Sequence, residues 1–183
     1  MLYHVSGTEN LSVLVPHVST HGTPFVYATA DICIALLFGA PKDDFDLFID
    51  FADGKAVVCE CYENAFKDVY ENKRCSVYQV EDTTFIKDAT GWSPELVSKE
   101  PVPVVNECKV DNLYHVLMQE VENGNILLSL YDNSIEYRKK ISNHIVDRLI
   151  RFEILDGEIP AKIKEKFPRL LEGLEKLISG EYL

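Results

Sequence analysis

Two short segments near the start of the chain carry side chains that are suited to binding a small molecule together. Residues 3–7 contain His4 and Ser6, and residues 25–29 contain Tyr27. An imidazole and a hydroxyl form hydrogen bonds with ligand hydroxyl groups, and a tyrosine ring offers a flat face for stacking. Each residue alone is more often structural, since aromatic residues are common in strands. Their order, separation and flanking residues single them out.

The surrounding residues extend this pattern. Tyr27 is followed by Ala-Thr-Ala-Asp and then by a segment of small and apolar residues with helical spacing. Residues 75–81 contain Val-Tyr-x-Val, and residues 98–105 begin Ser-x-Glu-Pro and continue with hydrophobic residues. Together these segments resemble the ADP-ribosyltransferase superfamily of the His-Tyr-Glu type, and in particular small bacterial members such as the rifamycin-modifying type. The resemblance covers roughly residues 1–110 and does not extend to the rest of the chain.

The resemblance implies a site for NAD, which would be a substrate rather than a resident cofactor. The family's first motif places His4 and Ser6 on the nicotinamide ribose, and its second places Tyr27 on the nicotinamide ring. Val5 and Thr29 would complete the NAD-binding stretches. The family usually has glycine after the histidine, where its backbone approaches the nicotinamide amide, whereas this chain has Val5.

The family also implies a carboxylate near the ribose, because breaking the bond between nicotinamide and ribose passes through an oxocarbenium-like state. We expect Glu100 to be this acid, since it lies at the start of a predicted strand. Asp88 and Glu95 remain alternatives, because residues 83–99 cannot be aligned securely with the family. Residues 19–22, Ser-Thr-His-Gly, would form a loop that lines the nucleotide pocket.

The resemblance therefore predicts an NAD-dependent ADP-ribosyltransferase or NAD glycohydrolase with an unknown acceptor, either a protein or a small molecule. The alternative from another class is a non-catalytic interaction module that keeps the fold, for example one of mobile-element or toxin-system origin with a partner-binding helical tail. The side chains in the cleft would distinguish the enzyme from the module.

Composition narrows the partners. The 183-residue chain has a net charge of -12, which repels phosphate backbones and makes nucleic acid an unlikely partner. Residues 1–5 lack a basic leader, and the longest apolar stretch, residues 32–40, is shorter than the roughly 18 residues of a membrane span, so we expect a cytoplasmic protein.

Five cysteines without an export signal favour reduced thiols. Cys59 and Cys61 have no second pair at zinc-ligand spacing, so we expect buried core thiols and no metal.

The pattern of the chain changes near residue 110. Before it, β-branched and aromatic runs bounded by Gly, Pro, Asp or Asn predict strands at residues 3–5, 25–29, 56–61, 76–80 and 102–110. Residues 32–39 show helical spacing, with Thr29 or Asp31 placed to cap the helix. We therefore predict an α+β fold, with an ADP-ribosyltransferase-like split antiparallel sheet in a domain of residues 1–110.

The apolar stripes of residues 111–183 predict a helical extension, which packs on that domain or on a partner. Asp111 could cap a helix that ends at Asn123-Gly124, and a second apolar stripe runs from Ile135 to Ile150. A third stripe comprises Ile163, Phe167, Leu170, Leu171, Leu174, Leu177 and Ile178, and Pro168 should kink its helix or start a new one. A stripe this apolar must be covered by the sheet or by a second chain, so a homo-oligomer formed through these helices is possible.

Overall fold

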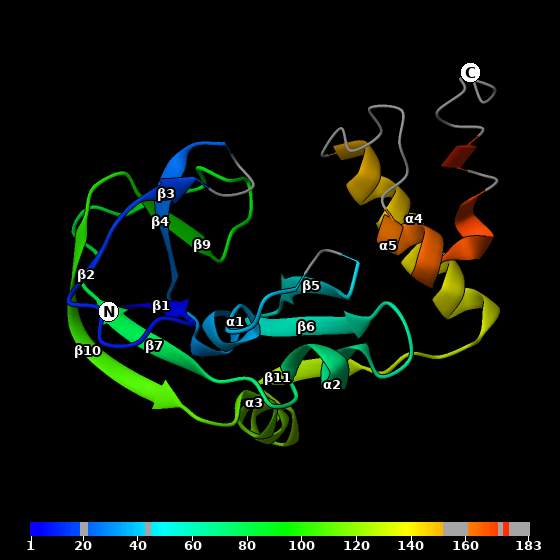
Figure 1. Cartoon of the computed structure of the whole chain (residues 1–183), viewed down its shortest axis with the longest axis horizontal. Helices are drawn as coiled ribbons and strands as arrows, with labels where there is room; N and C mark the ends of the chain where they lie inside the picture. Colours follow the sequence, from blue (N-terminus) through cyan, green and yellow to red (C-terminus); the bar gives the residue numbers. More distant parts are fainter. Residues whose placement is uncertain (19–21, 43–44, 152–160, 172–173, 176–183) are drawn as a thin grey trace. The chain divides into compact units, whose positions relative to one another are not determined.

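The computed structural model describes residues 1–18, 22–42, 45–151, 161–171 and 174–175 (Figure 1). It contains both helices and antiparallel strands, which confirms the α+β class. The chain separates into two compact units. The first comprises Met1–Lys42, Ile49–Val58 and Lys67–Leu128, and the second comprises Asp43–Phe48, Cys59–Phe66 and Ser129–Leu183. The boundary expected at residue 110 does not coincide with this division, because residues 111–128 group with the first unit.

The first unit is built on a sheet that, in the described part of the chain, has eight strands. Its order is β2-β10-β7-β1-β4-β9-β8, with β3 paired to β4 (Figure 1). The strands are β1 (Leu2–Ser6), β2 (Val13–Leu14), β3 (His17–Val18), β4 (Pro24–Thr29), β7 (Cys75–Val80), β8 (Ile86–Lys87), β9 (Glu95–Ser98) and β10 (Val102–Val110). β1 pairs with β7 along its whole length, and Tyr3 of β1 lies opposite Thr29 of β4.

Two helices of the first unit begin at side-chain caps. Helix α1 (Ile32–Leu37) starts after Asp31, whose carboxylate accepts hydrogen bonds from the amides of Cys33 and Ile34. Of the two expected caps, Asp31 is therefore the one used. Helix α3 (Leu113–Glu122) is capped by Asn112 rather than by the expected Asp111, since the Asn112 side chain accepts the His115 amide.

One apolar cluster covers a face of the first unit's sheet. Its buried members come from β1, β2, β4, β7, β9 and β10: Leu2, Leu14, Val26, Ala28, Tyr78, Val80, Leu96 and Val102. These residues alternate along their strands with residues of the other face, as a two-sided sheet requires. Helix α1 contacts β1, β4 and α3 and is buried over most of its length.

A second sheet has the order β11-β6-β5, with strands β5 (Leu47–Ala52), β6 (Lys55–Glu60) and β11 (Ile126–Ser129). The residues of each of these strands, and those of helix α2 (Ala65–Tyr70), are divided between the two units. Cys59 and Cys61 are buried in the second unit, which confirms the interpretation of both as core thiols.

The second unit's core is formed largely by helix α4 (Ile135–Arg151) and the C-terminal stripe. Ile141, Ile145 and Leu149 of α4 pack with Ile163 of helix α5 (Ala161–Lys166) and with Leu174. α5 ends before Pro168, which begins a short 3₁₀ helix (Pro168–Leu170), so this proline starts a new helix as expected. Within the described part of the stripe, Ile163 and Leu174 are buried and Phe167, Leu170 and Leu171 are partly buried against this core, while Leu177 and Ile178 lie outside the described residues.

In the part of the chain that the structure describes, no helix is both long enough and apolar enough to cross a membrane.

Gly39 is tightly enclosed after α1, and its replacement tests the packing of the first unit. A Cβ atom at Gly39 would lie 2.8 Å from the Cys75 sulfur and 3.0 Å from a Leu113 methyl group. We expect Gly39→Ala to lower the free energy of unfolding by about 1–3 kcal/mol through overpacking, measured by urea denaturation. Gly7→Ala is the control, because nothing lies within 4 Å of a Cβ atom there. Equal stability of the two variants would contradict this packing.

Candidate functional site

His4 lies on β1 and is held by the main chain of β4. Its Nδ1 atom donates a hydrogen bond of 2.7 Å to the Tyr27 carbonyl oxygen. Because a carbonyl oxygen only accepts hydrogen bonds, Nδ1 carries a proton, and Nε2 of the neutral ring is an acceptor. Burial lowers the pKa of His4 below its usual value, and the nearby His17 lowers it further, against the opposing effect of the Tyr27 bond. Neutral His4 therefore presents one fixed tautomer.

His4 and Tyr27 come from neighbouring strands, but their side chains do not meet directly. The recorded pair between β1 and β4 is Tyr3 opposite Thr29. Side chains alternate along each strand, so continued alternation from this pair directs His4 and Tyr27 to opposite faces. His4 reaches the Tyr27 backbone, while the Tyr27 ring makes an edge contact with the His17 ring at 6.5 Å between centroids.

Two polar rows cross β1, β7 and β10 on the face that carries His4. His4 is opposite Tyr78, which is opposite Glu107, and Ser6 is opposite Ser76, which is opposite Lys109. Directly opposed residues project from the same face of a sheet. The register therefore gathers an imidazole, three hydroxyl groups, a carboxylate and an ammonium group: His4, Ser6, Ser76, Tyr78, Glu107 and Lys109.

Glu107 is a candidate functional acid that the sequence reasoning missed. Its Oε1 accepts hydrogen bonds from the Ser76 hydroxyl at 2.6 Å and from the Tyr78 hydroxyl at 3.2 Å. Both carboxylate oxygens accept from the Asn10 amide, at 3.1 and 3.2 Å. The Ser76 bond, followed by the Asn10 bond, holds the pKa of Glu107 below its usual value, so the carboxylate is ionised at neutral pH. Its signal in the sequence is an acid in the middle of the predicted strand 102–110.

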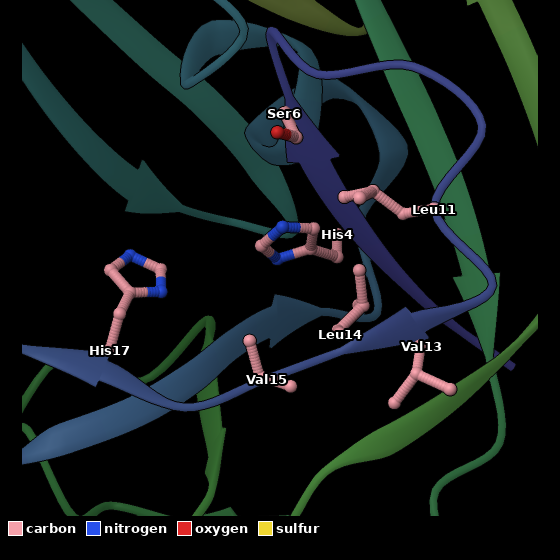
Figure 2. Close-up of a pocket in the computed structure, with 7 residues that line it drawn as sticks. All are labelled: His4, Ser6, Leu11, Val13, Leu14, Val15 and His17. Atoms are coloured by element: carbon pink, nitrogen blue, oxygen red, sulfur yellow. The ribbon is translucent and has the colours of Figure 1, made fainter.

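A hollow of about 150 Å³ opens beside His4 and Ser6 (Figure 2). Leu11, Val13, Leu14 and Val15 form an apolar wall, and His17 from β3 completes the lining. His4 and His17 both border this space in Figure 2. The hollow thus combines polar groups that can orient a ligand with apolar surface that can cover it.

The three acids expected from the sequence have different local surroundings. Glu100 is exposed beyond the end of β9, where the Ser98 hydroxyl binds its amide and its carbonyl oxygen. Asp88 is exposed after β8 and has a positive φ of 60°. Glu95 lies on β9 directly opposite Thr29 of β4, which places it on the Tyr27 face of the sheet. Glu95 is therefore on the other face from His4, whereas Glu100 and Asp88 lie outside the paired strands, so the register assigns neither of them to a face.

The remaining expected residues have local structural partners. Val5 is opposite Val77 on β7, so it projects from the other face than His4 and does not crowd the polar rows. The Ser6 hydroxyl accepts the Thr8 amide at 3.1 Å. Thr29 is buried, and its hydroxyl accepts the Asp31 amide at 3.1 Å. Residues 19–21 of the expected pocket loop lie outside the described residues.

Metal-ligating side chains do not gather in the described ranges. No group of three or more His, Cys, Asp or Glu residues is positioned there to hold a metal ion.

No family model matches the sequence, and neither the curated proteins nor the solved structures that were compared with the chain give a match. Functional inference therefore rests on the residues and geometry of the first unit.

The lowered pKa of His4 predicts how stability changes with pH. The folded chain resists protonating His4, so the unfolded chain binds the extra proton as the pH falls below about 6.5. His4 thus stabilises the fold fully above pH 6.5 and progressively less below it. We expect the free energy of unfolding to fall between pH 7 and 5.5, and His4→Asn, which cannot titrate, to flatten this change. Denaturant unfolding at several pH values measures it.

The control for this experiment is His115→Asn on the exposed side of α3, which we expect to keep the wild-type pH dependence. An unchanged pH dependence in His4→Asn would contradict the buried, neutral state of His4.

Proposed function

We propose that the first unit binds NAD and cleaves its bond between nicotinamide and ribose, acting as an ADP-ribosyltransferase or, with water as acceptor, as an NAD glycohydrolase. The observation that carries this proposal is the placement of ionised Glu107 and neutral His4 on one face, two strands apart. The sequence resemblance supports the same substrate.

His4 borders the hollow, and Glu107 lies beyond Tyr78 on the same face. Neighbouring strands lie about 4.8 Å apart, so the backbones that carry His4 and Glu107 are separated by roughly 10 Å. In the proposed complex, Nε2 of His4 accepts a hydrogen bond from one ribose hydroxyl, and Glu107 faces the ribose from the other side. Positive charge develops on the ribose as nicotinamide leaves, and a fixed carboxylate stabilises that charge more in the transition state than in the ground state.

The acceptor is proposed to be a protein side chain or a small molecule. The net charge of -12 disfavours nucleic acid through long-range repulsion. A positive side chain still stands near the polar rows, since Lys109 projects beside Ser76 and pairs with Glu9 at 2.7 Å.

A non-catalytic interaction module is the second candidate. It is favoured by the register of β1 and β4, which directs the Tyr27 ring away from the His4 face. In this alternative the hollow binds a ligand without turnover, and the contact between His4 and Tyr27 is structural. Enzyme and module differ in whether NAD is cleaved by the purified chain.

The first test separates Glu107 from the acid expected from the sequence. Glu107→Gln should keep NAD affinity and reduce NAD cleavage on the order of 10²- to 10³-fold, because the lost interaction strengthens mainly in the transition state. Nicotinamide release measured by chromatography gives the rate, and calorimetry gives the affinity. Glu100→Gln, at an exposed position, is the matched control and should cleave NAD like the wild type. Loss of cleavage in Glu100→Gln alone would return the role to Glu100.

The second test concerns the stacking role of Tyr27. Tyr27→Ala should weaken NAD binding by roughly 1–3 kcal/mol if the ring stacks on nicotinamide. Tyr27→Phe keeps the ring and should bind NAD with nearly wild-type affinity. Calorimetry showing equal affinity for the alanine variant and the wild type would show that the Tyr27 ring does not stack on nicotinamide. The strand register would then describe the position of Tyr27 better than the family pattern does.

A further inference from the structure

The segment between β1 and β2 is tied to the polar rows at three successive residues. The Thr8 carbonyl oxygen accepts a hydrogen bond from the Tyr78 hydroxyl at 2.7 Å. The Glu9 carboxylate pairs with Lys109 at 2.7 Å, and the Asn10 amide donates to Glu107. The segment therefore follows the side chains of β7 and β10.

Tyr78 is the central link of this arrangement. Its ring is fully buried, and its hydroxyl contacts the Thr8 carbonyl oxygen, the Leu11 amide at 3.3 Å and Glu107 Oε1 at 3.2 Å. A phenol has one proton to donate, so the carbonyl oxygen of Thr8 and the carboxylate of Glu107 compete for it. A change in either acceptor therefore alters the hydrogen bond of the hydroxyl to the other.

The same segment forms a wall of the hollow. Leu11 lines the hollow, and its amide donates to the Tyr78 hydroxyl. Asn10, one residue earlier, has a positive φ of 60°, a conformation that asparagine adopts more readily than most residues. Tyr78 thus touches the backbone of the wall and the carboxylate at once.

We propose that Tyr78 is a positioning residue, whose hydroxyl aligns the wall at Leu11 with the Glu107 carboxylate so that both face the same bound ribose. This inference rests on the proposed NAD-cleaving function. Its physical basis is that catalysis by a fixed carboxylate depends on orientation, and small displacements of a catalytic group lower the rate strongly.

The test compares two variants in the full-length chain, Tyr78→Phe and Tyr70→Phe. Tyr70 is an equally buried tyrosine of α2, and its hydroxyl donates to a backbone carbonyl, that of Leu37, at 2.6 Å. Each substitution removes one buried hydroxyl and keeps the ring. Hydrogen exchange of the amides of residues 8–11 is measured without NAD, and the kcat and KM of NAD cleavage are measured separately.

We expect Tyr78→Phe to speed exchange at residues 8–11 by about tenfold or more and to lower kcat by about 10- to 100-fold with little change in KM. Tyr70→Phe should match the wild type in both measurements. An equal loss of kcat in Tyr70→Phe would overturn the proposal, because the loss would then follow from removing any buried hydroxyl and not from the position of Tyr78.

The remaining outcomes separate this inference from the proposed function. If the wild type cleaves NAD and Tyr78→Phe keeps its kcat, the positioning role is wrong, whether or not exchange is faster. If the wild-type chain neither binds nor cleaves NAD, the proposed function is overturned and the positioning role with it, whatever the exchange rates.

Discussion

The register of β7 is the constraint on which the first unit depends. β7 pairs with β1 over five residues and with β10 on its other edge, and all but one of its residues are buried. Because side chains alternate in a strand, a shift of one residue would exchange the two faces of β7 relative to both neighbours. Tyr78 and Val80 would then leave the apolar cluster, and the polar rows would be dispersed. Burial of the cluster therefore also fixes which polar groups share the His4 face.

The contact between His4 and Tyr27 joins two strands and fixes the tautomer of the imidazole. Tyr3 of β1 lies opposite Thr29 of β4, and two residues before Thr29 the Tyr27 carbonyl oxygen accepts a hydrogen bond from the His4 ring. The His4 side chain thus links β1 to the backbone of β4. The same bond fixes the proton on Nδ1 and leaves Nε2 as an acceptor. A histidine can thus stabilise the sheet and still keep one ring atom for a ligand.

Local features of the fold were predictable from the sequence, whereas the composition of the site was not. Caps depend on residues two or three positions away, so the sequence limited the cap of α1 to Thr29 or Asp31 and missed the cap of α3 by one residue. Pro168 starts a helix for an equally local reason, since its ring fixes φ. The position of Glu107 beside Ser76 depends instead on the pairing of strands some thirty residues apart. The alternation of side chains within one strand shows which residues share a face, but it does not show which strand lies beside it.

The first unit's boundary illustrates the same limit. Helix α3 has the helical pattern that suggested an extension beginning at residue 111, and that pattern is correct for the helix. Its buried residue Leu113 nevertheless lies against Gly39 after α1, and the Leu113 amide donates to the Lys73 carbonyl oxygen. Amphipathic spacing shows that a helix must bury one face, but it does not show which part of the chain covers that face.

Glu60 and Glu107 are both glutamates, but they differ in the groups that donate hydrogen bonds to their carboxylates. Glu60 in the second unit is buried and accepts the amides of Phe66 and Tyr131, at 2.9 and 2.8 Å. Both donors are backbone groups of the packed unit, so its charge is balanced by fixed structure. Glu107 is half-buried and accepts from two hydroxyls and from the Asn10 amide of a connecting segment. Two of the groups that donate to Glu107 are side-chain hydroxyls, whereas both donors to Glu60 are backbone amides, so the two carboxylates are held in different ways.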